Sequence, residues 1–113
     1  MKLLDNITDD PKQTMFLVIE GYDTAKLELF WRPNQIGWFF NLTWQNFSVY
    51  NQRITTSPNI LRQYKNLLPF GLLVSTNSKV DPIVQQAFVE SNSMYLMDST
   101  DVALVESTYF GNV

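Results

Sequence analysis

The segment from Ile36 to Trp44 constrains the fold more than any other part of the chain. Its sequence, Ile-Gly-Trp-Phe-Phe-Asn-Leu-Thr-Trp, suits a β-strand, in which successive side chains point to opposite faces. One face would carry only large apolar side chains, which are Trp38, Phe40, Leu42 and Trp44. The other face would carry both apolar and polar side chains. This pattern predicts a strand that buries one side in a hydrophobic core.

Other segments predict strands around this one. Residues 13–20 and 25–31 precede it and are separated by turn sequences, so residues 13–44 are expected to form a meander of three antiparallel strands. A tight turn at Gln45-Asn46 leads into a fourth strand, expected over residues 47–54 with Ser48, Tyr50 and Gln52 on one face. Shorter apolar segments at residues 2–7, 70–75 and 94–97 are expected to add further strands.

The spacing of apolar residues changes after residue 54. Ser57 is a suitable N-cap with Pro58 at the first helical position, and apolar residues then recur at steps of three and four. This pattern predicts one short helix over residues 58–66, ended before Pro69. Residues 83–89 fit either a helical stripe or a loop on the core, residues 77–82 read as a polar loop, and residues 102–105 suit an extended conformation.

Together these patterns predict a single domain over residues 1–113, with a flexible tail from about residue 99. The expected fold class is all-β or β-rich α+β. A small antiparallel sheet would curl into a barrel or sandwich, with one short helix near residues 58–66.

Composition argues against several functions. The chain has no cysteine and no histidine, which removes thiolate chemistry, the usual general base and the commonest transition-metal ligands. Its net charge of -3 and the absence of basic runs argue against nucleic acid and anionic membranes. No apolar run approaches the ~20 residues of a membrane helix. No secretory signal is visible at the start, so we expect synthesis in a cytoplasm.

No residue pattern favours catalysis. Asp9 and Asp10 are adjacent in a turn, and Asp98 and Asp101 lie near the tail, but nothing local fixes either pair across a cleft as a hydrolase requires. We therefore expect no catalytic residue, no metal site and no cofactor. A different class remains as an alternative, because a carbohydrate-binding module could stack sugars on exposed aromatic rings. Its candidate residues are Trp31, Trp38 and Trp44.

Apolar side chains are more numerous than one face of a sheet can bury. Phe30 and Phe39 both oppose the face assigned to the core, so either the sheet curls over them or a partner covers them. This motivates an assembly role in which Phe30, Phe39 and Tyr50 are the candidate interface residues.

Several motifs occur in an order and spacing that resemble one known family. They are Pro11-x-Gln13-Thr14-Met15-Phe16, Glu20-Gly21-x-x-x-x-Ala25-x-Leu27-x-Leu29, Ile36-Gly37-Trp38-Phe39-Phe40-Asn41-Leu42, Leu61-x-x-Tyr64-x-x-Leu67-x-x-Phe70-Gly71-Leu72-Leu73-Val74, Asp81-Pro82 and Met94-Tyr95-Leu96. Over residues 11–98 the chain resembles the small baseplate plug proteins of contractile-tailed bacteriophages. It departs from that pattern at Gln45-Asn46, where the family has an acidic or glycine turn.

The resemblance implies a structural protein of the virion, located in the tail baseplate after synthesis in the host cytoplasm. It implies a place at the central hub, where the protein would plug or join the tail tube. The implied partners are other baseplate and tail proteins (hub, spike and tube), together with further copies of this chain in a ring or trimer. It implies no enzyme activity.

Overall fold

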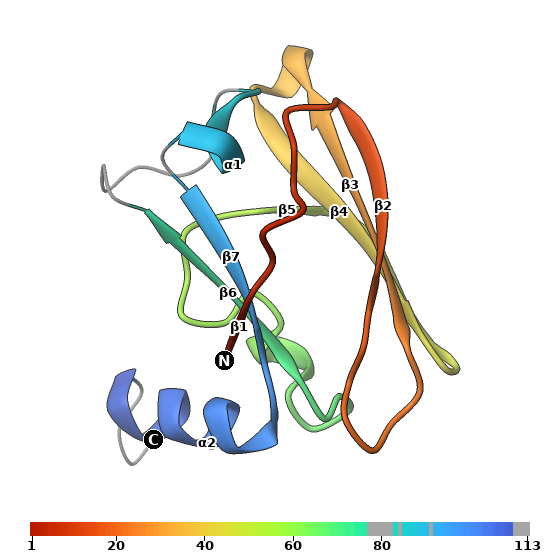
Figure 1. Ribbon diagram of the computed structural model, residues 1–113, viewed down its shortest axis with the longest axis vertical. Coiled ribbons are helices and arrows are strands. Elements are labelled where there is room, and N and C mark those ends of the chain that lie inside the picture. The colour runs from red at the N-terminus through yellow and green to blue at the C-terminus, as the bar shows by residue number, and fades with distance from the viewer. Residues whose placement is uncertain (77–82, 84, 91, 110–113) are drawn as a thin grey trace.

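A computed structural model describes residues 1–76, 83, 85–90 and 92–109 of the chain. Two antiparallel sheets lie face to face in it (Figure 1). The larger sheet has the order β2-β3-β4-β5 and the smaller has the order β1-β7-β6. The strands are β1 (Lys2–Leu3), β2 (Lys12–Leu17), β3 (Ala25–Arg32), β4 (Gly37–Trp44), β5 (Phe47–Arg53), β6 (Gly71–Thr76) and β7 (Asn92–Met97). The helices are α1 (Ala87–Glu90) and α2 (Ser99–Tyr109), with 3-10 helices at Pro33–Gln35 and Arg62–Tyr64.

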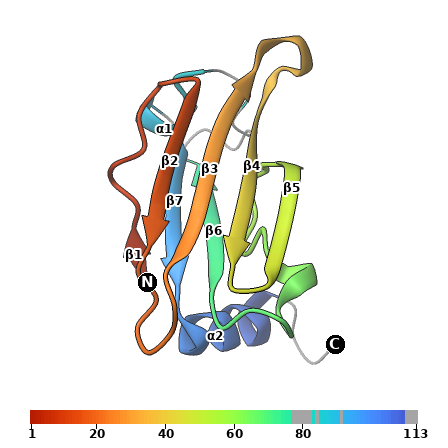
Figure 2. The same ribbon diagram turned by 90° about the vertical axis from the view of Figure 1, so that its right-hand side faces the viewer.

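The larger sheet confirms the predicted meander. Strands β2, β3 and β4 pair in sequence order (Figure 2). Leu29 lies opposite Phe40 and Leu27 lies opposite Leu42. Alternate side chains of β4 are buried as the sequence predicts, since Trp38, Phe40, Leu42 and Trp44 all belong to the core. The hairpin from β4 to β5 turns at Gln45-Asn46, with Trp44 opposite Phe47.

A β-bulge interrupts the pairing of β4 with β5. Asn51 has a positive φ of 58°, and its backbone N–H donates to Oδ1 of Asn41 at 2.8 Å. The extra residue shifts the register between Phe40 and Leu42, so Gln52 pairs with Phe40 and lies on its face of the sheet. The predicted grouping of Gln52 with Ser48 and Tyr50 is therefore wrong, because strict alternation does not continue through a bulge.

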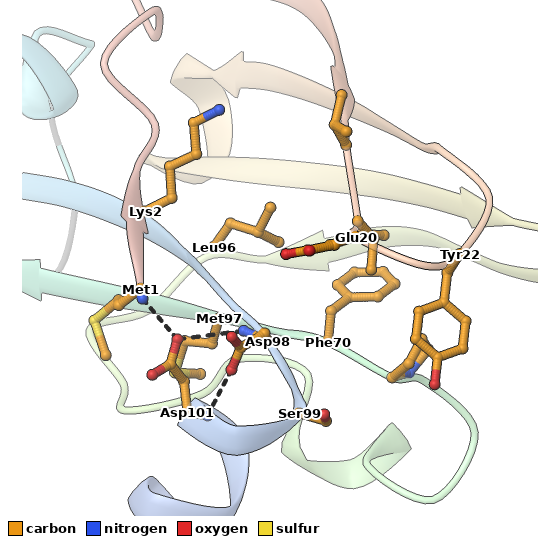
Figure 3. A pocket seen from close by; sticks show the side chains of 13 residues that line it. Met1, Lys2, Glu20, Tyr22, Phe70, Leu96, Met97, Asp98, Ser99 and Asp101 are labelled. Atoms are coloured by element: carbon orange, nitrogen blue, oxygen red, sulfur yellow. Dashed lines mark hydrogen bonds and ion pairs between the residues drawn. The ribbon is translucent and has the colours of Figure 1, made fainter.

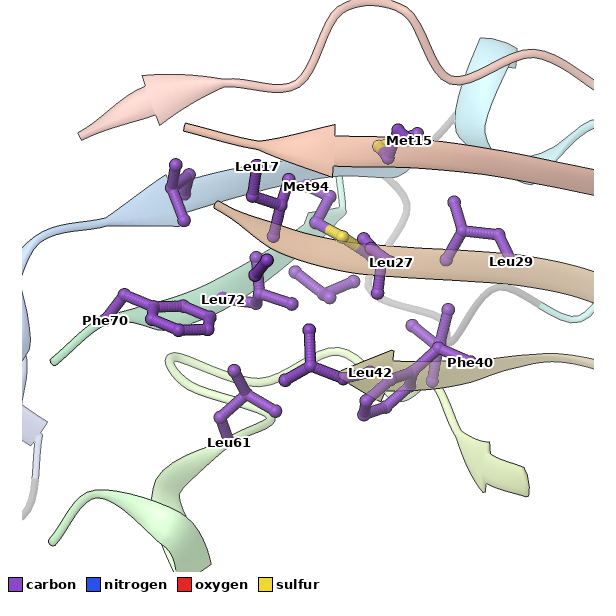
Figure 4. Close-up of a cluster of buried hydrophobic side chains, with 14 of the residues drawn as sticks. Met15, Leu17, Leu27, Leu29, Phe40, Leu42, Leu61, Phe70, Leu72 and Met94 are labelled. Atoms are coloured by element: carbon purple, nitrogen blue, oxygen red, sulfur yellow. The ribbon is translucent and has the colours of Figure 1, made fainter. Parts of the chain in front are cut away.

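The core fills the space between the two sheets, and the fold is a sandwich that does not close into a barrel. Most of its larger buried side chains come from the inner faces of β2, β3, β4, β6 and β7, while Leu61 and Phe70 come from the connection between β5 and β6 (Figure 4). They include Met15, Leu17, Leu27, Leu29, Phe40, Leu42, Leu61, Phe70, Leu72 and Met94. Burial of these side chains is the main stabilising contribution to such a fold.

The helix predicted over residues 58–66 is present only as the 3-10 helix Arg62–Tyr64. The preceding residues pair with β6 instead: the N–H of Ser57 donates to the carbonyl of Val74, and the N–H of Val74 donates to the carbonyl of Ser57. The N–H of Ile60 donates to the carbonyl of Leu72. Oδ1 of the buried Asn59 accepts from the N–H groups of Leu61 and Leu72 at 2.9 and 3.2 Å. Because these backbone groups bond to β6 and to the side chain of Asn59, they do not form the hydrogen bonds of an α-helix.

Two helices occupy the later part of the chain. Within the ambiguous segment 83–89, helix α1 begins at Ala87, which is buried against the core. The extended conformation suited to residues 102–105 is not found, because these residues lie inside α2 at one end of the sandwich (Figure 1). Asp98 and Asp101 explain the helix start, as Oδ1 of Asp98 accepts from the N–H of Asp101 at 2.8 Å and Oδ2 of Asp101 accepts from the N–H of Asp98. The loop expected over residues 77–82 lies outside the described residues.

Candidate assembly surface

The outer face of the larger sheet carries two of the three candidate interface residues as a pair. Phe30 and Phe39 are directly opposite each other on β3 and β4. Their rings are stacked, with centroids 6.1 Å apart and an interplanar angle of 20°. The structure therefore brings these two residues together on the side of the sheet that faces away from the core.

Two arginines cover this aromatic pair. The guanidinium carbon of Arg32 lies 4.7 Å from the ring centroid of Phe30 and 4.8 Å from that of Phe39. That of Arg53 lies 5.4 Å from the centroid of Phe39. Arg32 donates to side-chain oxygens of Gln35 and Asn51, and Arg53 donates to the carbonyls of residues 35 and 36. The guanidinium groups are thus held in place by hydrogen bonds while they stack on the rings.

This cover changes which candidate residues can reach a partner. Phe39 is only 8% exposed, so the expectation of an exposed side chain there is wrong. The alternation of side chains along the strand correctly placed Phe39 on the face away from the core. It could not show that arginines from β3 and β5 lie over the ring. Tyr50, on β5, is 57% exposed and makes no ring contact with Phe30 or Phe39 in the described residues. Of the three candidates, Tyr50 offers the most accessible surface.

Gly37 leaves the space through which Arg53 passes. A Cβ at position 37 would lie 2.8 Å from the guanidinium carbon of Arg53, which is too close. We expect Gly37→Ala to push the guanidinium away from its backbone carbonyl acceptors and to lower the free energy of unfolding by about 1 kcal/mol. Urea denaturation measures the change. In an Arg53→Ala background the same Gly37→Ala change should be nearly neutral, and equal losses in both backgrounds would contradict this role.

The tryptophans do not form a sugar-binding platform. Trp38 is 0% exposed, and its ring lies between those of Trp31 and Phe88, with centroid distances of 6.0 and 5.8 Å. Trp44 is also buried, and its indole N–H donates to the carbonyl of Asp23. The surface position that the carbohydrate-binding alternative requires of these tryptophans is not found, because β4 turns both of them toward the core.

The side of the sandwich where β1 and β2 lie holds exposed apolar residues that sequence reasoning did not select. Phe16 and Val18 are 66% and 73% exposed. Together with Leu3 and Leu4 they line a groove of about 230 Å³ between these two strands. The alternation that exposes these residues was visible in the sequence. The buried residues Met15, Leu17 and Ile19 alternate with the exposed residues Lys12, Thr14, Phe16, Val18 and Glu20.

A second cavity, of about 190 Å³, lies at the end of the sandwich beside α2 (Figure 3). Glu20, Asp98 and Asp101 are among its lining residues. The amino group of Met1 lies 2.7 Å from Oδ2 of Asp101. This hydrogen bond raises the pKa of the amino group and lowers the pKa of the Asp101 carboxyl. Asp98 and Asp101 are thus engaged in the helix start and an ion pair.

The remaining observations give no second kind of site. Asp9 and Asp10 lie in a turn, where Oδ1 of Asp10 accepts from the N–H of Lys12. Across the described part of the chain, no group of three or more acidic side chains is placed to hold a metal ion. None of the helices in that part is long and apolar enough to cross a lipid bilayer.

Comparison with known proteins gives a match over most of the chain. The family described as "Cyanophage baseplate Pam3 plug gp18" matches residues 1–104. This range includes every strand of both sheets and the first half of α2. A search of curated proteins gives no match.

Proposed function

Because this chain belongs to the cyanophage baseplate plug family and is a structural component of a phage tail baseplate, we propose that it acts at the central hub. There it would plug the tail tube or join it to neighbouring proteins until ejection. The family match over residues 1–104 is the observation that carries this proposal. The protein would be made in the host cytoplasm and then incorporated into the virion.

We propose that the protein works by burying surface against its neighbours and not by catalysis. The hub, the spike and the tail tube are the proposed neighbours, together with further copies of this chain. In support, the stacked pair of Phe30 and Phe39 is fixed under Arg32 and Arg53, which gives the larger sheet a firm outer face. A stable contact of this kind buries ~800 Å² on each partner.

Tyr50 is the residue through which we propose that the larger sheet contacts a neighbour. Its ring is 57% exposed on β5, an edge strand of that sheet. Tyrosine combines apolar area with a hydroxyl group, a combination that is common in protein interfaces. Phe30 and Phe39 would contribute to the same contact through Arg32, whose guanidinium lies over both rings.

Deletion of the gene in its phage tests the proposed function. We expect deletion to stop tail assembly before complete contractile tails form, and the wild-type gene supplied in trans to restore them. Antibody labelling should place the protein at the distal end of the tube in purified tails. Complete tails without the protein, or label elsewhere on the particle, would contradict the proposal.

A Tyr50→Ala variant tests the proposed contact residue in the same complementation assay. We expect fewer complete tails because the variant loses an exposed ring that would be buried against a neighbour. Ser48→Ala is a matched control, since Ser48 is an exposed residue of the same strand but offers little apolar area. Equal numbers of complete tails from both variants would show that Tyr50 is not a contact residue.

A further inference from the structure

Strand β2 lies at one edge of the larger sheet. In the described part of the chain, β2 pairs with β3 alone. The N–H of Trp31 donates to the carbonyl of Pro11, so the hydrogen-bonded pairs that follow in this register are Gln13–Leu29, Met15–Leu27 and Leu17–Ala25. Thr14 and Phe16 fall between these pairs. Their backbone N–H and C=O groups therefore point away from β3, toward the open edge.

This edge also carries exposed apolar side chains between two opposite charges. Alternate side chains along the outer face are Lys12, Thr14, Phe16, Val18 and Glu20, and all five are exposed. The burial pattern continues past the end of β2, because Val18 is exposed and Ile19 is buried. An exposed edge with unpaired backbone groups and apolar side chains is a template for a further strand.

We propose that β2 pairs antiparallel with β2 of a second copy of this chain about a two-fold axis at Phe16. In this register Phe16 lies opposite Phe16 of the second copy, and Thr14 lies opposite Val18. Lys12 then lies opposite Glu20, and the two-fold symmetry repeats this ion pair at the other end of the interface. Two four-stranded sheets would merge into one sheet of eight strands.

Charge and apolar matching favour this register over its neighbours. An axis at Thr14 would place Lys12 opposite Phe16 and Asp10 opposite Val18, so each charge would face an apolar side chain. An axis at Val18 would place Glu20 opposite Phe16. Only the axis at Phe16 puts the aromatic rings together at the centre and opposite charges together at both ends, which is the arrangement that stabilises antiparallel strands.

This interface would join the chain to one further copy about a two-fold axis, as in a dimer, and it rests on the proposal that further copies of this chain are among its neighbours. It is tested on the isolated full chain in solution, without other tail proteins. Incorporation into tails is measured separately in the phage. A failure of the strand pairing and a failure of the baseplate role therefore give different results.

Cross-linking tests the register directly, because the chain has no cysteine of its own. Two residues that form a hydrogen-bonded antiparallel pair have Cα atoms ~5.5 Å apart, which a disulfide can span. We expect Phe16→Cys to form a covalent dimer on mild oxidation. Thr14→Cys should form no covalent dimer, because its opposite residue is Val18. Ser48→Cys, exposed on the far edge of the same sheet, controls for random collision.

Charge exchange tests the end contacts without changing Phe16. We expect Lys12→Glu or Glu20→Lys to weaken self-association by about tenfold in analytical ultracentrifugation, since each change creates two repulsive pairs. The double variant with both changes should restore association. Circular dichroism checks that these exposed substitutions leave the fold unchanged.

Three results would overturn the proposal. The first is a wild-type chain that stays monomeric at about 1 mM, where even contacts of millimolar affinity are partly occupied. The second is cross-linking of Thr14→Cys or Ser48→Cys as efficient as that of Phe16→Cys. The third is a double charge variant that associates no better than the single variants.

Discussion

Replacing Trp38 with alanine is expected to lower the free energy of unfolding by about 3–5 kcal/mol, the largest effect of any substitution considered. The side chain is 0% exposed and lies between Trp31 of β3 and Phe88 of α1. Its loss would open a cavity where the larger sheet meets α1. A domain of this size has a total stability of only about 5–15 kcal/mol, so the variant should be close to unfolding. Urea denaturation followed by circular dichroism measures the change.

Tyr50→Ala is the matched control for this substitution. It also removes an aromatic ring from a strand of the larger sheet, but from an exposed position. We expect its stability to change by no more than about 0.5 kcal/mol. If the two variants unfolded at the same urea concentration, Trp38 could not occupy the buried position described.

Replacing Asn59 with alanine is expected to cost about 2–4 kcal/mol, because two backbone N–H groups would lose their acceptor in the core. These groups belong to Leu61 and Leu72, both fully buried. Gly71 supports the same arrangement, since a Cβ there would lie 2.9 Å from side-chain atoms of Asn59. The measurement is again urea denaturation, with amide hydrogen exchange at Leu72 expected to accelerate.

Asn66→Ala provides the comparison for Asn59→Ala. Asn66 lies in the same connection between β5 and β6 but is exposed to solvent. Its replacement should leave the free energy of unfolding within about 0.5 kcal/mol of the wild-type value. Similar losses for the two variants would show that the buried carbonyl of Asn59 is not what stabilises this connection.

The sequence predicted the larger sheet well because its strands alternate clearly. In β4, four large apolar side chains fall at every second position and all four are buried. The turns at Gly21 and at Gln45-Asn46 were also predicted, the first by the conformational freedom of glycine. The baseplate plug family was identified from the order and spacing of several motifs, and the family match confirms it.

The helix predicted over residues 58–66 is shortened to the 3-10 helix Arg62–Tyr64, because side chains compete with the backbone for hydrogen bonds before it. Ser57, Pro58 and the apolar spacing after them do resemble a helix start, but the side chain of Asn59 binds N–H groups on both sides of a chain reversal. Nothing in local spacing shows that Leu72, 13 positions later, will donate one of those bonds. Tertiary context decides such cases.

The start of α2 and the cover over Phe39 were missed for two further reasons. The Asp98-x-x-Asp101 spacing is a capping box, and it could have been recognised from the sequence. The position of Arg53 over Phe39 could not have been recognised from the sequence. It depends on the bulge at Asn51, which decides the face of the sheet on which residue 53 lies.

The pairing of residues 57–60 with β6 has a consequence for polymerisation. Leu72 and Val74 each have both their N–H and their C=O groups occupied by this segment, so the rim of the smaller sheet cannot recruit another chain there. A molecule able to add strands at every rim is prone to polymerise into fibrils. Sealing the rim at β6 with its own polypeptide removes one of the places where unassembled molecules could polymerise.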